Sequence, residues 1–250
     1  MQNIAKPKKI NFQECENPNQ AIVTIEPCYP GYGTTLGNSL RRVLLSSLSG
    51  AAAVGVKIKG ATHEFTTLPN IKEDVLEIIL NLKQLKLKQF SDEEIKLELK
   101  AHGKKTVKAS DISKNSSVKI VNPDLILAHI TDITGSLDME IYVDQGIGYR
   151  PTESIENKKK KVGYIEMDSI FSPVLSVEIH VENVRIGKMT NWDKLILNIT
   201  TDGSISPEEA YNTSVEILID QLKSLIKKEE DTNKLKDKKK KEKIEKTKKL

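Results

Sequence analysis

Apolar residues recur at intervals of three and four in three parts of the chain, which is the spacing of one face of an α-helix. The predicted helices span residues 36–48, 71–85 and 207–227. The third also has a start signal, because Ser206 can cap the helix, Pro207 suits its first position and Glu209 completes a capping box. The pattern therefore predicts three amphipathic helices.

Most of the chain between these helices alternates between apolar and polar residues, as half-buried strands do. Clear alternation occurs at 94–101, 136–144, 173–184 and 194–200, and shorter runs occur at 20–25 and 54–59. Helices and strands do not alternate regularly along the chain, which argues against an array of βαβ units. The sequence therefore predicts an α+β fold.

The first predicted helix has two different faces when its residues are placed about 100° apart. Asn38, Arg42 and Leu45 lie on one face, and an arginine beside an outward leucine indicates a protein contact. The opposite face is apolar and consists of Leu36, Leu40, Val43, Leu44 and Leu48. That apolar face could pack on the chain's own core or on a second copy, and the sequence leaves both alternatives open.

The last predicted helix carries an apolar seam that resembles a heptad repeat. Its members are spaced at four, three, four and three residues, and they are Tyr211, Val215, Leu218, Leu222 and Leu225. This seam could cover the chain's own sheet, or it could pair with another copy. The sequence again leaves both alternatives open.

A glycine-rich loop, PGYGTTLG, leads into the first helix. A P-loop needs a lysine after its last glycine, whereas Gly37 is followed by Asn38 and Ser39. A dinucleotide fingerprint needs GxGxxG, and the spacing of Gly31, Gly33 and Gly37 has one residue too many. We therefore expect the loop to provide a tight turn before the helix, and not a nucleotide site.

Charge and composition locate the basic excess at one end of the chain. Residues 227–250 hold 12 lysines and 6 acidic residues, so the other 226 residues are slightly acidic although the whole chain has a net charge of +4. Such a segment cannot bury enough apolar surface to fold, so residues 229–250 are predicted to be a disordered lysine-rich tail. A body that is nearly neutral and only 4% aromatic does not indicate a nucleic-acid-binding module.

The sequence contains no motif that predicts an active site on this chain. The four histidines are scattered without HExxH spacing, and GxSxG is absent. Cys15 and Cys28 form no CxxC motif, which predicts free thiols in a reducing compartment. No apolar run is long enough to span a bilayer, and the first residues lack the apolar core of a signal peptide. We therefore expect no catalytic residue, metal site, cofactor or membrane anchor.

Motifs in order along residues 5–226 resemble one family. The longest is IEPCYPGYGTTLGNSLRRVLLSSLSGAA at 25–52, followed by THEFTT, KEDVLEIILNLK, YRP, SPV, DKL and TDGSISPEEA. Together they resemble the N-terminal part of the alpha subunit of bacterial and plastid DNA-directed RNA polymerase. Members of this family usually continue into a helical domain that binds promoter DNA. Here the lysine-rich segment follows instead, so we expect no direct promoter recognition.

The resemblance implies an architecture and a set of partners. It implies a discontinuous dimerisation domain, an antiparallel sheet with two helices built from residues 1–50 and 171–228, and an inserted mainly β domain at 51–170. The homodimer would be the platform for the two large catalytic subunits, of the beta and beta-prime type, without a cofactor on this chain. DNA would be contacted only through the complex or weakly through the tail. The location would be the bacterial cytoplasm, at the nucleoid, or a plastid.

The resemblance also implies roles for individual residues. Arg42 and Leu45 match positions that contact the second-largest subunit, and Lys83, Val174 and Lys194 match positions that hold the largest subunit. The dimer interface would use the apolar residues of the first and last helices, which are Leu36, Leu40, Val43, Leu44, Leu48, Tyr211, Val215, Leu218, Leu222 and Leu225.

Overall fold

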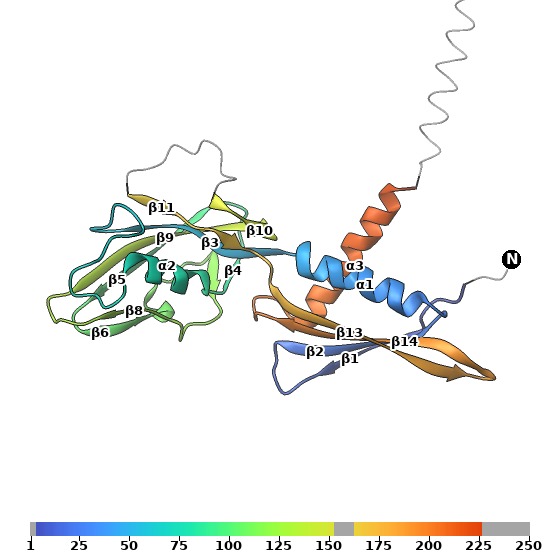
Figure 1. Ribbon diagram of the computed structural model, residues 1–250. Helices are drawn as coiled ribbons and strands as arrows, with labels where there is room; N and C mark the ends of the chain where they lie inside the picture. The colour runs from blue at the N-terminus through green and yellow to red at the C-terminus, as the bar shows by residue number, and fades with distance from the viewer. Residues whose placement is uncertain (1–3, 153–162, 227–250) are drawn as a thin grey trace, which may run out of the picture. The chain divides into compact units, whose positions relative to one another are not determined.

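The computed structural model describes residues 4–152 and 163–226 (Figure 1). The chain divides into two compact units, one up to Ser214 and one from Val215 onward, and each is described by itself. The helices are α1 Tyr32–Ser46, α2 Val75–Lys83 and α3 Pro207–Ser224, with a short 3-10 turn η1 at Ala109–Asp111. The strands are β1 Lys9–Glu14, β2 Gln20–Cys28, β3 Ser49–Ile58, β4 Leu87–Gln89, β5 Ile95–His102, β6 Lys105–Lys108, β7 Val118–Ile120, β8 Ile126–Ile130, β9 Ser136–Ile147, β10 Tyr149–Arg150, β11 Tyr164–Glu166, β12 Ser169–Ile170, β13 Val174–Ile186 and β14 Met189–Thr201.

A four-stranded antiparallel sheet unites the two ends of the first unit, in the order β1-β2-β14-β13. Its central strands alternate in burial, and their inward side chains meet in register, with Val23 opposite Leu197 and Ile25 opposite Leu195. Phe12 of β1 packs edge to face against Tyr211 of α3, with 5.4 Å between ring centres. One face of this sheet therefore forms a hydrophobic core.

Helix α1 lies over this sheet, and two glycines allow a close approach (Figure 1). A Cβ atom added at Gly37 would come within 2.9 Å of Leu195 Cδ1 and 3.0 Å of Ile179 Cγ2. Leu40 and Leu44 continue the same face and are 5% and 0% exposed. The glycine at position 37 thus brings the helix backbone close to the sheet, and the leucines that follow fill the core.

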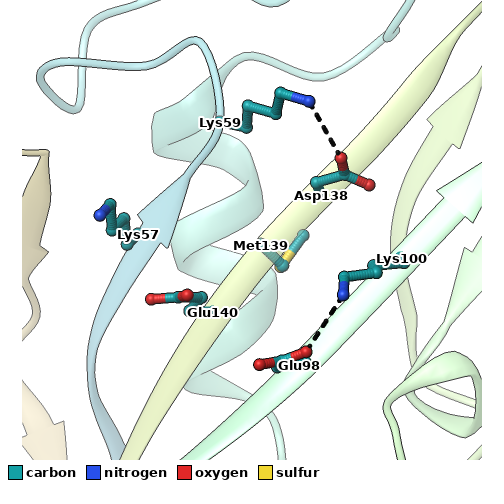
Figure 2. Close-up of a pocket in the computed structure, with 7 residues that line it drawn as sticks. All are labelled: Lys57, Lys59, Glu98, Lys100, Asp138, Met139 and Glu140. Carbon is teal, nitrogen blue, oxygen red and sulfur yellow. Dashed lines mark ion pairs between the residues drawn. The ribbon is translucent and has the colours of Figure 1, made fainter.

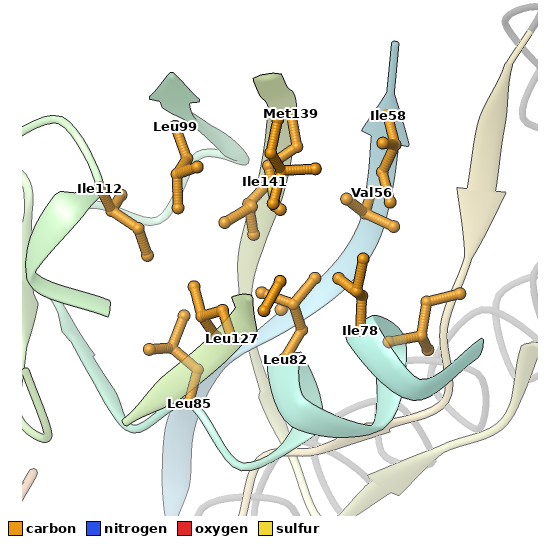
Figure 3. Packing of buried hydrophobic residues seen from close by; sticks show 14 of the residues in the cluster. Val56, Ile58, Ile78, Leu82, Leu85, Leu99, Ile112, Leu127, Met139 and Ile141 are labelled. Carbon is orange, nitrogen blue, oxygen red and sulfur yellow. The ribbon is translucent and has the colours of Figure 1, made fainter. Parts of the chain in front are cut away.

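Residues 49–170 supply a second group of sheets. The largest has the path β5-β9-β3-β4-β7, with β11 also paired to β3, and two small ladders join β6 to β8 and β10 to β12. Helix α2 packs its apolar face against this group, and its Ile78 and Leu82 are fully buried. Figure 3 shows these two side chains pointing toward Val56, Leu127 and the neighbouring strands. The result is a second hydrophobic core, separate in sequence from the first.

The chain enters and leaves this second group of sheets at adjacent points. A Cβ atom added at Gly50 would overlap the carbonyl oxygen of Phe171, so the two connecting segments touch along their backbones. Ser172 Oγ donates to Leu45 O at 3.1 Å, which ties the exit segment to α1.

The predicted α+β fold is confirmed, as are the three helices and the longer strands. Helix α2 begins four residues later than predicted because Asp74 caps it, accepting a hydrogen bond from Glu77 N at 2.7 Å. Ser206 caps α3 as predicted, with Glu209 N donating to its Oγ at 3.1 Å. Cys15 and Cys28 are free thiols, as predicted. The predicted tail at 229–250 lies outside the described residues.

The sequence did not predict several short strands, among them β4, β6, β7 and β8. Each has only three to five residues, too few for alternation to stand out from chance. Among the helices of the described segments, none combines the length and apolar character needed to cross a membrane.

Candidate functional site

The glycine loop before α1 binds a carboxylate of its own chain. Asp193 Oδ2, from β14, accepts hydrogen bonds from Gly31 N at 2.9 Å and from Gly33 N at 3.0 Å. Gly31 has φ +82°, a left-handed conformation that favours glycine and aims these amides at the carboxylate. Asp193 is only 7% exposed, and its charge complements the positive end of the helix dipole.

This arrangement argues against a phosphate site in the loop. The amides that would cradle an anion already donate to Asp193, and a second anion would be repelled by the buried carboxylate. The same carboxylate acts on the thiol of Cys28, whose pKa is raised first by burial and then by the charge of Asp193. We therefore interpret the loop as a structural device that fixes the start of α1 on the sheet.

The outer face of α1 carries the arginine and leucine that the sequence singled out. Arg42 is exposed, and its guanidinium has no ion-pair or hydrogen-bond partner within the described part of the chain. Leu45, one turn further along, is 36% exposed. A free cation beside an accessible apolar side chain leaves this face available to a protein partner.

The inner face of α1 is used within the chain itself. Leu40, Leu44 and Leu48 are at most 5% exposed in the single chain, so their side chains pack within it, and their use in a dimer interface stays a prediction. Leu36 and Val43 are half-buried and retain some accessible surface. Of the two alternatives that the helical wheel left open, packing on the chain's own core applies to the three buried leucines.

The end of α3 has the opposite character. Leu222 and Leu225 are 61% and 77% exposed, and Ile219 and Ile226 beside them are 44% and 70% exposed. We call these four residues the α3 apolar row. Earlier in the same predicted seam, Tyr211 is buried, while Val215 and Leu218 are half-buried. The seam thus begins in the protein core and ends in a row of accessible aliphatic side chains.

Lys83, at the end of α2, forms an ion pair with Asp168, with 3.4 Å between Nζ and Oδ2. The amide of Thr152 and then Lys83 hold the pKa of Asp168 below its usual range. Lys83 also borders a groove of about 520 Å³. Phe65 and Leu80 line this groove and are 72% and 51% exposed. We call it the α2 groove.

The other two predicted contacts with the largest subunit differ from each other. Lys194 lies on β14 and forms an ion pair with Glu182, with 3.1 Å between Nζ and Oε2. Val174 is only 4% exposed, so its side chain offers a partner no surface. The three predicted residues lie on three different elements. Of these three, only Lys83 and Lys194 present a charged group at the surface.

A buried carboxylate, hydrogen-bonded to His129, fixes the segment before α2. Glu73 is 6% exposed, accepts a hydrogen bond from His129 N at 2.7 Å and also contacts the ring Nδ1 of His129. Burial alone would raise the pKa of Glu73, but the hydrogen bonds from the His129 ring and backbone outweigh it, so this pKa lies below its usual value. The pair anchors the start of α2 to β8.

We expect Glu73→Gln to lower the free energy of unfolding by about 2 kcal/mol at pH 7, because it removes a charged acceptor from a buried site. A carboxylate with a lowered folded pKa stabilises above its unfolded pKa and loses this effect as the pH falls through the folded pKa. The difference between variant and wild type should therefore shrink at acidic pH. Urea unfolding of the variant and the wild type at pH 7 and at acidic pH measures this difference. Glu77→Gln is the control because Glu77 is exposed, and an equal loss there would contradict the prediction.

The outer face of the β5-β9-β3 region bears alternating charges. A hollow of about 250 Å³ is lined by lysine and acidic side chains, and Figure 2 shows Lys59 paired with Asp138 and Lys100 paired with Glu98. The first pair joins the end of β3 to β9 and the second lies along β5, and in each pair the opposite charges neutralise each other at the surface. Among the described residues, no group of His, Cys, Asp or Glu side chains could hold a metal ion.

No sequence pattern predicted the structural roles of two of the most informative side chains, Asp193 and Glu73. Both act on segments far away in the sequence, which no local pattern reveals. One indirect signal existed for Asp193. The turn before α1 contains Pro30 and Gly31 and lacks a serine, threonine or aspartate to cap the helix, so the acceptor had to come from elsewhere.

Comparisons with known proteins agree with the fold. A family model described as the RNA polymerase Rpb3/RpoA insert domain matches residues 56–172. Three curated proteins named DNA-directed RNA polymerase subunit alpha align over 226 residues, or 90% of this chain. They come from Carboxydothermus hydrogenoformans at 48% identity, Desulforamulus reducens at 47% and Oceanobacillus iheyensis at 45%, and the alignments cover 71%, 71% and 72% of these relatives.

Proposed function

The chain belongs to the family of DNA-directed RNA polymerase alpha subunits, and from this premise we propose that it is the assembly subunit of such a polymerase. It pairs with a second copy of itself, and the pair holds the two large subunits that carry out nucleotidyl transfer. Its own contribution is binding and not chemistry. The observation that carries this proposal is the division of α1 into a face locked on the sheet and a free face with Arg42 and Leu45.

The rigidity of α1 supports its role as a docking element. Gly37 and Asp193 fix the helix on the sheet, so the outward residues are held in place before a partner arrives. A pre-organised contact loses less conformational entropy on binding than a mobile one. Arginine is enriched among residues that dominate binding energies, and Leu45 would exclude water from its contact with the second-largest subunit.

The α3 apolar row supports pairing with a second copy. Four aliphatic side chains on one short segment are costly to leave in water, and a twofold axis would cover both copies of the row at once. We base this proposal on the row alone, because Leu40, Leu44 and Leu48 pack within the single chain.

Lys83 and Lys194 are the proposed contacts with the largest subunit. Each is already paired with an acidic residue, so a partner would exchange these ion pairs for its own carboxylates. The α2 groove beside Lys83 adds accessible apolar surface from Phe65 and Leu80. We further propose that residues 1–50 with 171–228, and residues 51–170, act as separate domains, and that the complex works in the cytoplasm.

Arg42→Ala tests the proposal directly. The variant should lose binding to the second-largest subunit by at least about tenfold, because truncating a central arginine commonly costs more than 1 kcal/mol. It should remain a dimer, since the Arg42 guanidinium has no ion-pair or hydrogen-bond partner within the described part of the chain. Wild type and variant are co-expressed with the second-largest subunit, and complex mass is measured by size exclusion with light scattering.

Arg41→Ala is the matched control, because it removes the same charge from the adjacent exposed position. Wild type should give two copies of this chain with one large partner, and so should the control. A wild-type protein that runs alone as a monomer would refute both the dimer and the assembly role. Equal loss of binding in the two variants would attribute the effect to charge and not to the face of α1.

A further inference from the structure

A second groove lies in the sheet group of residues 49–170, away from every residue assigned to a partner above. Its volume is about 400 Å³, and its lining includes Leu97 of β5 and residues 118–120 of β7. β5 and β7 are the two ends of the path β5-β9-β3-β4-β7. Strands from both ends of this path therefore line one groove, and the groove lies in the gap between them, beside Ile112 and Ser113, which bridge to β5.

The β7 side of this gap presents a strand edge that is unpaired at Ile120, whereas Val118 N already donates to Asn115 O at 3.5 Å. Phe90 N donates to Ser117 O and Val121 N donates to Lys86 O, both at 2.9 Å, which identifies the residues of β7 that face β4. By the alternation of an antiparallel ladder, Ile120 turns its N–H and C=O to the opposite side. Neither group has a backbone partner among the described residues. Such an edge can accept an extended peptide as an additional strand.

The side chains around the gap favour an apolar residue in that peptide. Phe90, directly after β4, is 62% exposed at the groove. Ile112 and Val118 also line the groove and are 3% and 7% exposed. An exposed aromatic ring above aliphatic side chains suits a side chain inserted from a strand.

The charges around the gap are of one sign. Lys114 and Lys119 line the groove, are exposed and have no ion-pair partner in the described segments. None of the lining residues is an aspartate or a glutamate. This differs from the hollow of Figure 2, where lysines and acids neutralise each other. The groove is therefore complementary to carboxylates.

We propose that this groove binds an extended acidic peptide segment of a partner protein. The segment adds to β7 as a strand, directs an apolar side chain against Phe90, and places its carboxylates beside Lys114 and Lys119. This site goes beyond subunit assembly, because it shares no residue with the α1 face, the α2 groove or the α3 apolar row. It would give the assembled protein a place to receive a further factor.

The test uses the full chain and fluorescent peptides of about eight residues, the length of an ordinary strand. One peptide alternates glutamate with valine, a second alternates lysine with valine, and a third is the glutamate peptide with N-methylated backbone amides. Fluorescence anisotropy should show saturable binding of the first peptide alone. Phe90→Ala should weaken it about tenfold. Lys114→Ala with Lys119→Ala should weaken it severalfold and reduce its salt dependence.

Phe65→Ala is the matched control, because Phe65 is also an exposed phenylalanine, at 72% against 62%, but lies in the α2 groove, and it should leave the affinity unchanged. Phe90 is a surface residue, and circular dichroism verifies that its variant is folded. The proposal is overturned if the glutamate peptide does not bind at about 1 mM. It is also overturned if the lysine or N-methylated peptide binds as well, or if Phe90→Ala has no effect. Tighter binding of a single-stranded oligonucleotide, lost in the same variants, would assign the groove to nucleic acid instead.

Discussion

Replacing Leu222 and Leu225 with glutamate is expected to convert the protein from a dimer to a monomer. Both side chains belong to the α3 apolar row and are 61% and 77% exposed in the single chain, so the change need not disturb its core. In a twofold interface each substitution occurs twice, and four unpaired carboxylates would lose their hydration together. We expect the dimer dissociation constant to rise about 1,000-fold, since an uncompensated buried charge costs about 3–5 kcal/mol.

Sedimentation velocity over a concentration series measures this change. Gln221→Glu with Ser224→Glu is the control, because it adds the same charge to the same stretch of the chain outside the apolar row. The control should remain a dimer. A Leu222→Glu, Leu225→Glu protein that still sediments as a dimer would show that the row is not the interface, and the pairing of copies would have to use another surface.

Asp193→Ala is expected to have the second large effect, a loss of about 3 kcal/mol in the free energy of unfolding. The substitution removes a buried acceptor from two amides, and a hydrogen bond to a charged group contributes about 1.5–3 kcal/mol. The start of α1 should loosen first, which would expose the amides of residues 31–35 to solvent. Chemical denaturation gives the loss, and hydrogen exchange locates it.

Asp124→Ala is the control for this experiment. Among the described residues Asp124 pairs only with Lys108 at the surface, and its side chain is 91% exposed, so its removal should change stability by less than about 0.5 kcal/mol. If Asp193→Ala were as stable as the control, the carboxylate would not be what holds the loop. In that case the phosphate alternative for the glycine loop would have to be examined again.

The local spacing of apolar residues was sufficient to predict the larger helices and strands. It failed where contacts with distant parts of the chain determine where an element begins. The spacing of apolar residues predicted α1, α2 and α3 and placed Arg42 and Leu45 on the outer face of α1. It could not place the start of α1 at Tyr32, because the acceptor that allows those residues to be helical comes from β14. Helix ends depend on capping groups, and a cap from a distant strand has no local signature.

The apolar faces illustrate a second limit. A helical wheel identifies which residues avoid water, but it does not say what covers them. Leu44 and Leu225 look alike in the sequence, yet one is fully buried and the other is 77% exposed. Only the fold distinguishes the core from a surface that needs a partner. The resemblance implies a dimer contact for both residues, and the structure places one in the core and the other at the surface.

The contact between Gly50 and Phe171 has a consequence for how this architecture could vary over evolution. Because the incoming and outgoing segments touch, the stretch between them begins and ends at one place, and these two segments form its stalk. Such a stretch behaves as a cassette, since lengthening, shortening or exchanging it leaves the distance between its anchor points unchanged. Substitutions at the stalk would be far less tolerated than large changes within the cassette, because a side chain at Gly50 has no room beside the opposing backbone.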